Sequence, residues 1–289
     1  MRLPVNSSDS VPPNLLTKES FHYPETRPVF DLIEQASRRS GVSRGQAFED
    51  FLHMSVCALS GGQMEAQYLA TVQKHTEGKP GRRGCDSLAA AFGTLIAAME
   101  ETRKDILGDL FEGAITYGEN GQFMTSEPVA SLLASFSIQD RQEPVHDEQS
   151  SDLQPNGILD HRRQSAYDPC CGSGRMLLAI AGRQPHWEFI GQDIDLRCVR
   201  MTTLNLALRN LYGYVIWGDT LANERRLVYR TGFNLRCVVQ EIPLEDCPAP
   251  VRAAVSQPPP CNMPPTPAEM AFPNRDHTPA PPGKQQHLF

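Results

Sequence analysis

The hydrophobic pattern of this chain changes its period near residue 165, and this change limits the folds that are open to it. Downstream of that point, short apolar runs typical of strands alternate with segments of helical spacing. The predicted strands are 165–170, 187–193, 214–218 and 235–242, and the predicted helices between the first three are 176–181 and 196–211. Regular alternation of strand and helix predicts an α/β fold with a parallel sheet.

The part of the chain before the sheet is predicted to be helical. Apolar residues recur at helical spacing between Val29 and Ala70 and again between Leu88 and Ile106. A further helix is expected over 127–137, where four apolar side chains share one face: Val129, Leu132, Leu133 and Phe136. Thirteen of the 24 prolines fall between residue 243 and the C-terminus, which predicts a disordered tail. The expected organisation is a flexible lead-in (1–27), a helical region (28–117), an α/β domain (118–247) and a Pro-rich tail (248–289).

Composition and charge exclude several classes of protein. The net charge of −7 argues against a basic arm that coats nucleic acid by itself. No run approaches the ~20 apolar residues of a membrane span, and the first residues have no apolar core of a signal peptide. The eight cysteines form no Cys-x-x-Cys pair, so no metal site is expected. Such scattered cysteines are typical of reduced thiols, which predicts a cytoplasmic protein.

A glycine-containing turn between the first predicted strand and helix is the main candidate for a ligand site. It has the sequence Asp168-Pro169-Cys170-Cys171-Gly172-Ser173-Gly174. Glycines at such a turn let the backbone bend sharply and approach a ligand. A nicotinamide-binding fingerprint needs a third glycine where Leu177 stands, so that interpretation is disfavoured. The longer Asp-Pro-x-x-Gly-x-Gly pattern resembles the cofactor loop of S-adenosylmethionine (SAM)-dependent methyltransferases.

Four further segments stand in the order found in one branch of that class. They are the runs 105–112 (DILGDLFE), 121–129 (GQFMTSEPV), 190–195 (IGQDID) and 218–221 (GDTL). Together with the glycine loop they resemble the adenine-N6 DNA methyltransferases, especially the modification subunits of type I restriction systems. The resemblance covers about residues 105–242. It implies a Rossmann-like parallel sheet that binds SAM within the α/β domain.

The resemblance also implies roles for individual residues. The implied cofactor-binding set is Thr125, Asp168, Cys170, Gly172, Gly174, Asp193 and Asp219. In the family, an acidic residue such as Asp193 accepts from both ribose hydroxyls, and one such as Asp219 contacts the adenine amino group. Each acidic residue also has a purely structural alternative: Asp193 as a helix N-cap and Asp219 as a turn residue. Thr125 could likewise cap the helix that follows it.

The family's catalytic element, Asn-Pro-Pro-Tyr/Phe after the fourth strand, is not found in this sequence. Its Asn and first Pro carbonyl hold the target amine, and its aromatic ring stacks on the flipped base. At the end of the predicted strand 235–242 stands Glu241-Ile242-Pro243-Leu244, so Glu241 and Pro243 are the implied catalytic candidates. The run Gln257-Pro258-Pro259-Pro260 is a weaker alternative, because no apolar strand precedes it. No convincing strand follows residue 242, so the sheet is expected to end after its fourth strand.

Three functional hypotheses follow. The first is an adenine-N6 DNA methyltransferase that acts on double-stranded DNA, through a complex with specificity or modification subunits. The second is a catalytically weakened SAM-binding or partner subunit of such a system. The third is a decayed fragment without activity. SAM binding separates the third from the others, and methyl transfer separates the first from the second.

Overall fold

The computed structural model describes residues 19–116, 124–139, 164–234 and 238–247. All of them belong to one compact unit, residues 1–250, while residues 251–289 form a second unit outside the described part. The predicted lead-in before residue 19 and the predicted Pro-rich tail therefore lie outside the described residues. None of the described helices combines the length and apolar character that a bilayer crossing needs.

The N-terminal part is helical, as predicted. Its elements are α1 (Thr26–Ser40), α2 (Arg44–Ala58), α3 (Glu65–Gln73), α4 (Gly84–Thr102), α5 (Ile106–Leu110) and a π-helical turn, η1 (Phe111–Thr116). Local sequence explains several of the boundaries. Gly41 ends α1 in the left-handed region, with φ 66°, and the Ser43 side chain then caps α2 by accepting from the Gln46 backbone N–H.

The helix predicted over 127–137 is present as α6 (Glu127–Gln139), and it packs against α7 (Arg175–Ala181). Its buried positions are the small residues Ala130 and Ala134. The predicted apolar face is exposed instead: Val129, Leu132, Leu133 and Phe136 are between 43% and 60% accessible. The close approach of α6 to α7 through alanines explains why the larger side chains point outward.

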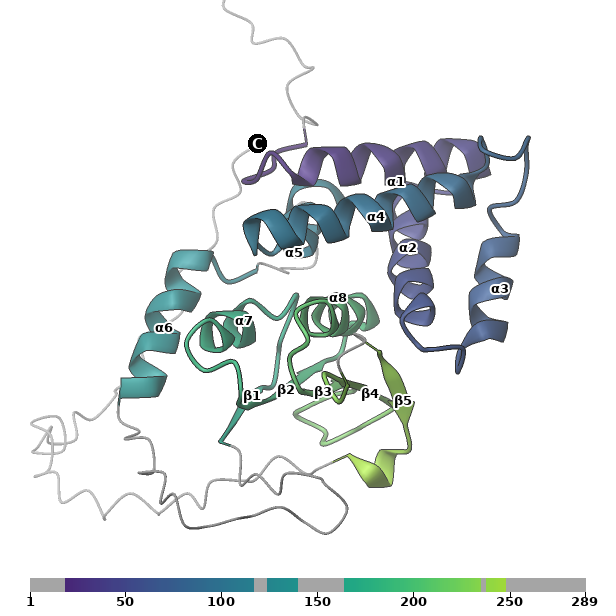
Figure 1. Ribbon diagram of the computed structural model, residues 1–289. Helices are drawn as coiled ribbons and strands as arrows, with labels where there is room; N and C mark the ends of the chain where they lie inside the picture. Colours follow the sequence, from purple (N-terminus) through teal and green to yellow (C-terminus); the bar gives the residue numbers. More distant parts are fainter. Residues whose placement is uncertain (1–18, 117–123, 140–163, 235–237, 248–289) are drawn as a thin grey trace, which may run out of the picture. The chain divides into compact units, whose positions relative to one another are not determined.

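The sheet contains five strands in the order β1-β2-β3-β4-β5. Their bounds are β1 (Ser165–Asp168), β2 (Glu188–Asp193), β3 (Gly213–Trp217), β4 (Leu227–Thr231) and β5 (Gln240–Ile242). The first three strands are parallel, with α7 and α8 (Leu196–Ala207) as the crossovers. Figure 1 shows both crossover helices on the same face of the sheet, as expected when successive strands are added in one direction.

The expectation of a parallel sheet that ends after its fourth strand is corrected by β4 and β5. A strand at 227–231 was not predicted, and it pairs antiparallel to β3. Of the predicted strand 235–242, residues 240–242 form β5, which pairs antiparallel to β4, and residues 235–237 lie outside the described residues. Only nine residues, 218–226, join β3 to β4, and a parallel crossover needs about a dozen or more.

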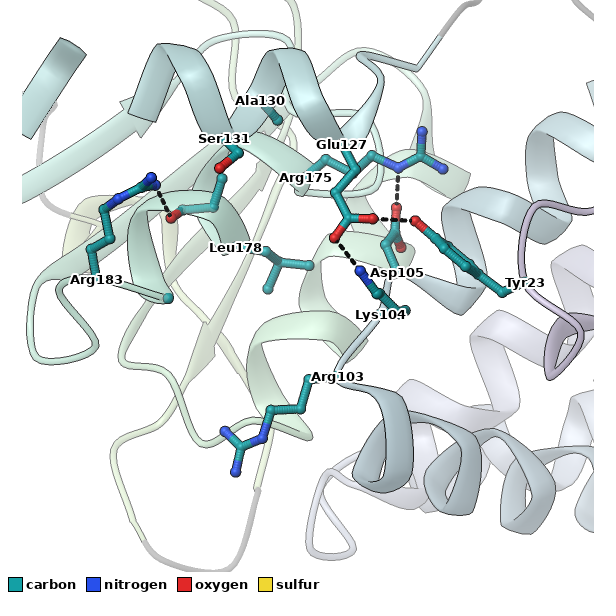
Figure 2. Close-up of a pocket in the computed structure, with 12 residues that line it drawn as sticks. Tyr23, Arg103, Lys104, Asp105, Glu127, Ala130, Ser131, Arg175, Leu178 and Arg183 are labelled. Atoms are coloured by element: carbon teal, nitrogen blue, oxygen red, sulfur yellow. Dashed lines mark hydrogen bonds and ion pairs between the residues drawn. The ribbon is translucent and has the colours of Figure 1, made fainter. Parts of the chain in front are cut away.

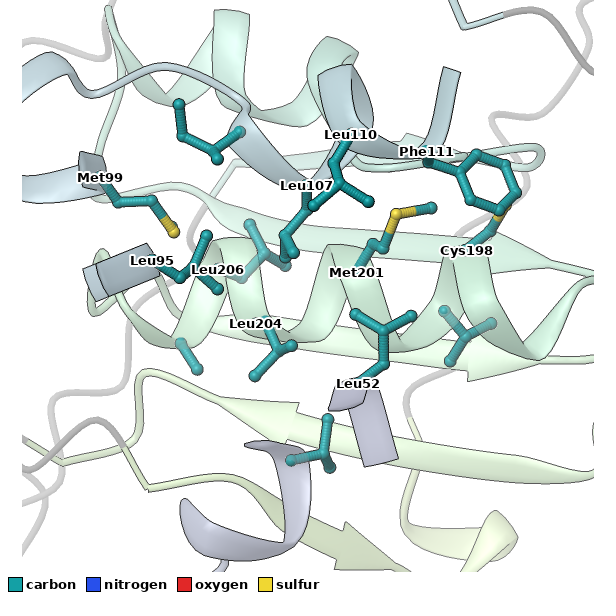
Figure 3. Close-up of a cluster of buried hydrophobic side chains, with 14 of the residues drawn as sticks. Leu52, Leu95, Met99, Leu107, Leu110, Phe111, Cys198, Met201, Leu204 and Leu206 are labelled. Carbon is teal, nitrogen blue, oxygen red and sulfur yellow. The ribbon is translucent and has the colours of Figure 1, made fainter. Parts of the chain in front are cut away.

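One hydrophobic core joins the helical region to the sheet. Figure 3 shows Leu107, Leu110 and Phe111 from the α5–η1 segment beside Met201 and other side chains of α8. Leu52 of α2 and Leu95 of α4 belong to the same cluster, as do Phe189 and Val215 on the sheet. On the other sheet face, a smaller cluster contains Ile190, Tyr214, Ile216, Val228 and Cys247. The helical region is therefore part of the same packed structure as the parallel strands.

Candidate cofactor site

Three carboxylates lie at the C-terminal ends of the parallel strands. Asp168 ends β1, Asp193 ends β2, and Asp219 follows β3 by two residues. Partial burial raises the pKa of the Cys170 thiol, and the charges of Asp193, Asp168 and Asp219 raise it further. All three carboxylates thus act on one thiol in the glycine loop. Open α/β folds bind ligands at these C-terminal ends of their parallel strands.

The glycine loop connects β1 to α7 and depends on backbone geometry that favours glycine. Gly172 has φ 54° and Gly174 has φ 90°. The Gly172 backbone N–H donates to Asp193 Oδ2 at 2.9 Å, and the Asp195 backbone N–H donates to Asp193 Oδ1 at 2.9 Å. Asp193 therefore holds the loop against the end of β2, and its carboxylate keeps acceptor capacity for a ligand. The N-cap of α8 is Asp195 rather than Asp193.

Electrostatics distinguish Asp168 and Asp193 from ordinary surface carboxylates. Burial raises the pKa of Asp168, and the charge of Asp193 adds to the effect. Burial also raises the pKa of Asp193, although backbone hydrogen bonds from Asp195 and Gly172 oppose the shift. A raised pKa means that ionising these groups at neutral pH disfavours the folded state. Such groups are typical of functional sites, and a cationic ligand would offset their repulsion.

Asp219 is a turn residue, which is the structural alternative given for it above. This role is compatible with a contact to the cofactor. Its Oδ1 accepts from the backbone N–H groups of Leu221 (2.8 Å) and Ala222 (3.1 Å), which closes a turn after β3. Next to it, the Thr220 hydroxyl donates to the Pro169 carbonyl oxygen at 2.7 Å. The loops after β1 and β3 are therefore tied together at the edge where Asp168 and Asp193 lie.

The segment before α6 reaches the glycine loop, as the family order implies. Thr125 is exposed, and its carbonyl oxygen accepts from the Arg175 guanidinium at 3.3 Å. The first helical bond of α6 joins the Ala130 N–H to the Ser126 carbonyl, so Ser126 rather than Thr125 occupies the N-cap position. Met124 lies over the loop: a Cβ added to Gly172 would stand 2.8 Å from the Met124 sulfur.

Glu241 and Pro243, the implied catalytic candidates, lie far from the β1 end of this site. Glu241 lies on β5, at the opposite edge of the sheet from β1. Four strand spacings of about 4.8 Å separate the two edges, or roughly 19 Å. The backbone of Glu241 exchanges two hydrogen bonds with the Gln63 side chain, at 3.0 and 3.1 Å. The alternative run 257–260 lies outside the described residues.

A set of polar residues behind the glycine loop, with Asp105 buried at its centre, escaped the sequence interpretation. Figure 2 shows Asp105 bonded to Arg175, next to a contact group formed by Tyr23, Glu127 and Lys104. These residues line a cavity of about 420 Å³. The only signal in the sequence was the family-like run 105–112, because the partners of Asp105 are distant in the chain.

Metal ligation has no support in the described residues, where no group of three or more His, Cys, Asp or Glu side chains could hold an ion. The cysteines described there are free thiols, and all but Cys170 are buried: Cys57, Cys85, Cys171, Cys198 and Cys247. The site therefore offers a glycine loop, backbone amides and carboxylates. That donor set suits an organic, positively charged cofactor with hydroxyl groups.

The fold and the site define an α/β protein with a cofactor loop at the C-terminal ends of its parallel strands. Residues 102–239, just under half of the chain, match the family described as N-6 DNA methylase. The match agrees with the suspected family, and the parallel strands with their crossover helices confirm the Rossmann-like fold, with the strand correction given above. The match supports SAM as the cofactor of this site.

One solved structure is similar to this chain at low identity. It is a protein from Listeria monocytogenes, provisionally assigned as a class I SAM-dependent methyltransferase, with 14% identity and a TM-score of 0.39. The alignment covers 69% of this chain and 55% of that protein, so the chain spans little more than half of its length. Similarity at this level carries no functional assignment. No curated protein sequence matches the chain significantly.

Proposed function

We propose that this chain binds SAM at the C-terminal edge of β1, β2 and β3, between the glycine loop and the acidic strand ends. The observation that carries the proposal is the Asp193 carboxylate, which bonds the Gly172 amide and retains acceptor capacity for two ribose hydroxyls. The sulfonium of SAM is positively charged, which suits the surrounding carboxylates Asp168 and Asp219. Thr125, Cys170 and Gly174 complete the proposed contact set.

We further propose that the bound methyl group is destined for adenine N6 in double-stranded DNA. The N-6 DNA methylase family supports this substrate. With a net charge of −7 the chain itself is a poor polyanion binder, so we propose that DNA is held through a complex with specificity or modification subunits. The proposal concerns the assembled complex rather than this chain alone.

Titration of the protein with SAM tests the cofactor proposal. Calorimetry is expected to show saturable binding, and Asp193→Ala is expected to weaken it about tenfold or more. The reason is that each hydrogen bond to a charged group contributes ~1.5–3 kcal/mol, and 1.4 kcal/mol corresponds to one decade. The matched control is Glu188→Ala, at the opposite end of β2, which should leave the affinity unchanged. Equal affinities for the parent and Asp193→Ala would remove Asp193 from the site.

A second candidate is a SAM-binding subunit that does not itself transfer the methyl group. The specific observation in its favour is the position of Glu241 and Pro243 on the far edge of the sheet. A methyl-transfer assay with labelled SAM and mixed-sequence DNA separates the two candidates. Transfer by the purified chain alone would favour the first candidate.

Restoring the family's catalytic residues at this position should not create activity. We expect the triple variant Glu241→Asn, Ile242→Pro and Leu244→Phe to transfer no more methyl groups than the parent, because β5 pairs with β4 rather than lying beside β1. The introduced proline also removes a backbone N–H from the β4–β5 pair. A clear gain of DNA methylation in the triple variant would show that residues 241–244 do reach the cofactor.

A further inference from the structure

Asp105 is a buried carboxylate at the junction between the helical region and the α/β part. It follows the end of α4 and caps α5, where its Oδ1 accepts from the Gly108 backbone N–H at 2.9 Å. The residue is 7% exposed. Taken alone, this geometry is that of an ordinary helix N-cap.

The other partners of Asp105 come from distant parts of the chain. Its Oδ2 accepts from the Ser173 hydroxyl at 2.5 Å and from Arg175 Nε at 2.7 Å, and its Oδ1 also accepts from Asn205 Nδ2 at 2.9 Å. Four donors thus use the four acceptor positions of one carboxylate. Ser173 belongs to the glycine loop, Arg175 begins α7, and Asn205 lies on α8. A single side chain therefore joins the helical region to the loop and both crossover helices.

Two neighbours extend this network. Asn205 Nδ2 also donates to the Ser173 carbonyl oxygen at 2.8 Å, so the loop is held through both its side chain and its backbone. Arg175, whose side chain is 10% exposed, bonds Glu112 at 2.9 Å and the Thr125 carbonyl at 3.3 Å as well as Asp105. Figure 2 shows the Asp105–Arg175 pair between α7 and the segment that follows α4. The network thus reaches Thr125 and Ser173, on two segments of the proposed cofactor site.

The glycine in the Asp105-x-x-Gly108 pattern is explained by the same contact. A Cβ added to Gly108 would collide with Asp105 Oδ2 and would stand 2.5 Å from the Ser173 hydroxyl oxygen. Only a residue without a side chain lets α5 approach the glycine loop this closely.

We propose that Asp105 is a positioning residue for the cofactor loop. Its bonds to Ser173 and Arg175 couple the conformation of residues 172–175 to the packing of the helical region. The inference rests on the proposed SAM site and adds to it. Asp105 touches no cofactor atom in this account. It acts by holding the loop in the binding conformation before the ligand arrives, which reduces the ordering that binding must supply.

The chain contains a matched control for this proposal in Asp109, on the same short helix. Asp109 is fully buried and also accepts four hydrogen bonds, from the backbone N–H groups of His22 and Tyr23 and from the side chains of His22 and Thr26. All of these donors lie at the start of α1 or just before it. Loss of either carboxylate should destabilise the fold, but only Asp105 bonds the glycine loop.

The test compares Asp105→Asn and Asp109→Asn in the full-length chain. Both variants are expected to have a lower Tm. Asp105→Asn should raise the Kd for SAM about tenfold, within the roughly 5–150-fold range typical of coupled sites, while Asp109→Asn should leave it within about twofold of the parent. Hydrogen exchange without SAM should show faster exchange at residues 171–175 in Asp105→Asn only.

The outcomes separate this proposal from the proposed function. A parent protein that does not bind SAM contradicts the function, and the exchange measurement then still decides whether Asp105 orders the loop. Unchanged Kd and unchanged exchange in Asp105→Asn, or equal changes in both variants, would overturn the positioning role. If Asp105→Asn does not fold, Asn205→Ala removes two bonds of the network from α8 and should give the same pattern with a smaller effect.

Discussion

Asp50→Ala is expected to lower the free energy of unfolding by about 3–5 kcal/mol, because it breaks a buried charged network from one side. Asp50 is 3% exposed and accepts from His75 Nε2 at 3.1 Å, Lys74 Nζ at 3.0 Å and Gln46 Nε2 at 3.2 Å. His75 is completely buried and bonds Ser40 through its other ring nitrogen at 2.7 Å. The network links the end of α1 to α2 and to the loop after α3. Urea-induced unfolding measures the effect.

The difference in the free energy of unfolding between the parent and Asp50→Ala should depend on pH in a definite direction. Burial works to raise the pKa of Asp50, but hydrogen bonds from His75 and Lys74 outweigh it and hold the pKa below its ordinary value. The stabilisation is therefore fully present above the unfolded-state pKa of about 3.9 and is lost as the pH falls through the lower, folded-state value. The gap in the free energy of unfolding between the parent and Asp50→Ala should narrow as the pH falls below about 4. A gap that widens on acidification would contradict this account.

Asp31→Ala provides the control for a carboxylate in an exposed pair. Asp31 is bonded to Arg27 at 2.8 Å on the surface of α1, and both side chains are about half exposed. Such a pair contributes within about 0.5 kcal/mol, so the variant should unfold almost as the parent does.

Gly174→Val is expected to abolish measurable SAM binding, with an affinity loss of at least about a hundredfold. Gly174 has φ 90°, which a β-branched residue does not adopt without strain of ~1–3 kcal/mol. Its Cβ would also stand 3.1 Å from Thr202 Oγ1, the hydroxyl that holds the Gly172 carbonyl at 2.8 Å. Relief of either contact moves the loop, which removes the proposed cofactor contacts. Calorimetric titration with SAM measures the loss.

Gly93→Val is the matched control for that variant. Gly93 lies inside α4, and a Cβ added to it meets nothing within 4 Å. Valine has a higher helix propensity than glycine, so stability should stay level or rise slightly, and the Kd for SAM should not change. Normal SAM binding by Gly174→Val would show that the loop geometry does not define the site.

The alternation of strands and helices was predictable because it is local. β1, α7, β2, α8 and β3 each carry their own hydrophobic period, and their order already implies crossovers and a parallel sheet. The glycine loop and the acidic residues at the strand ends were likewise predictable, since the strand ends position them without any other contact. The structure accordingly has three acidic residues at the C-terminal ends of the parallel strands, where the sequence places them: Asp168, Asp193 and Asp219.

The direction of the last two strands, β4 and β5, depended on information that a local sequence pattern does not contain. β4 is a five-residue run, and its direction follows from the short connection after β3 and from pairing with residues 213–217. β5 is held by β4 and by Gln63, which lies 178 residues before Glu241. The position of Glu241 and Pro243 relative to β1 was therefore not predictable from the local sequence.

The sequence by itself determined the helical region, the βαβαβ unit, its glycine loop and the family resemblance. Only the tertiary structure decided that β4 and β5 turn back antiparallel and that Asp105 lies beneath the loop. The bonds of Asp105 to Ser173, Arg175 and Asn205 span 68, 70 and 100 residues. Periodicity and turn chemistry act over a few neighbouring residues, whereas a buried carboxylate is satisfied by whichever donors the packed helices bring to it.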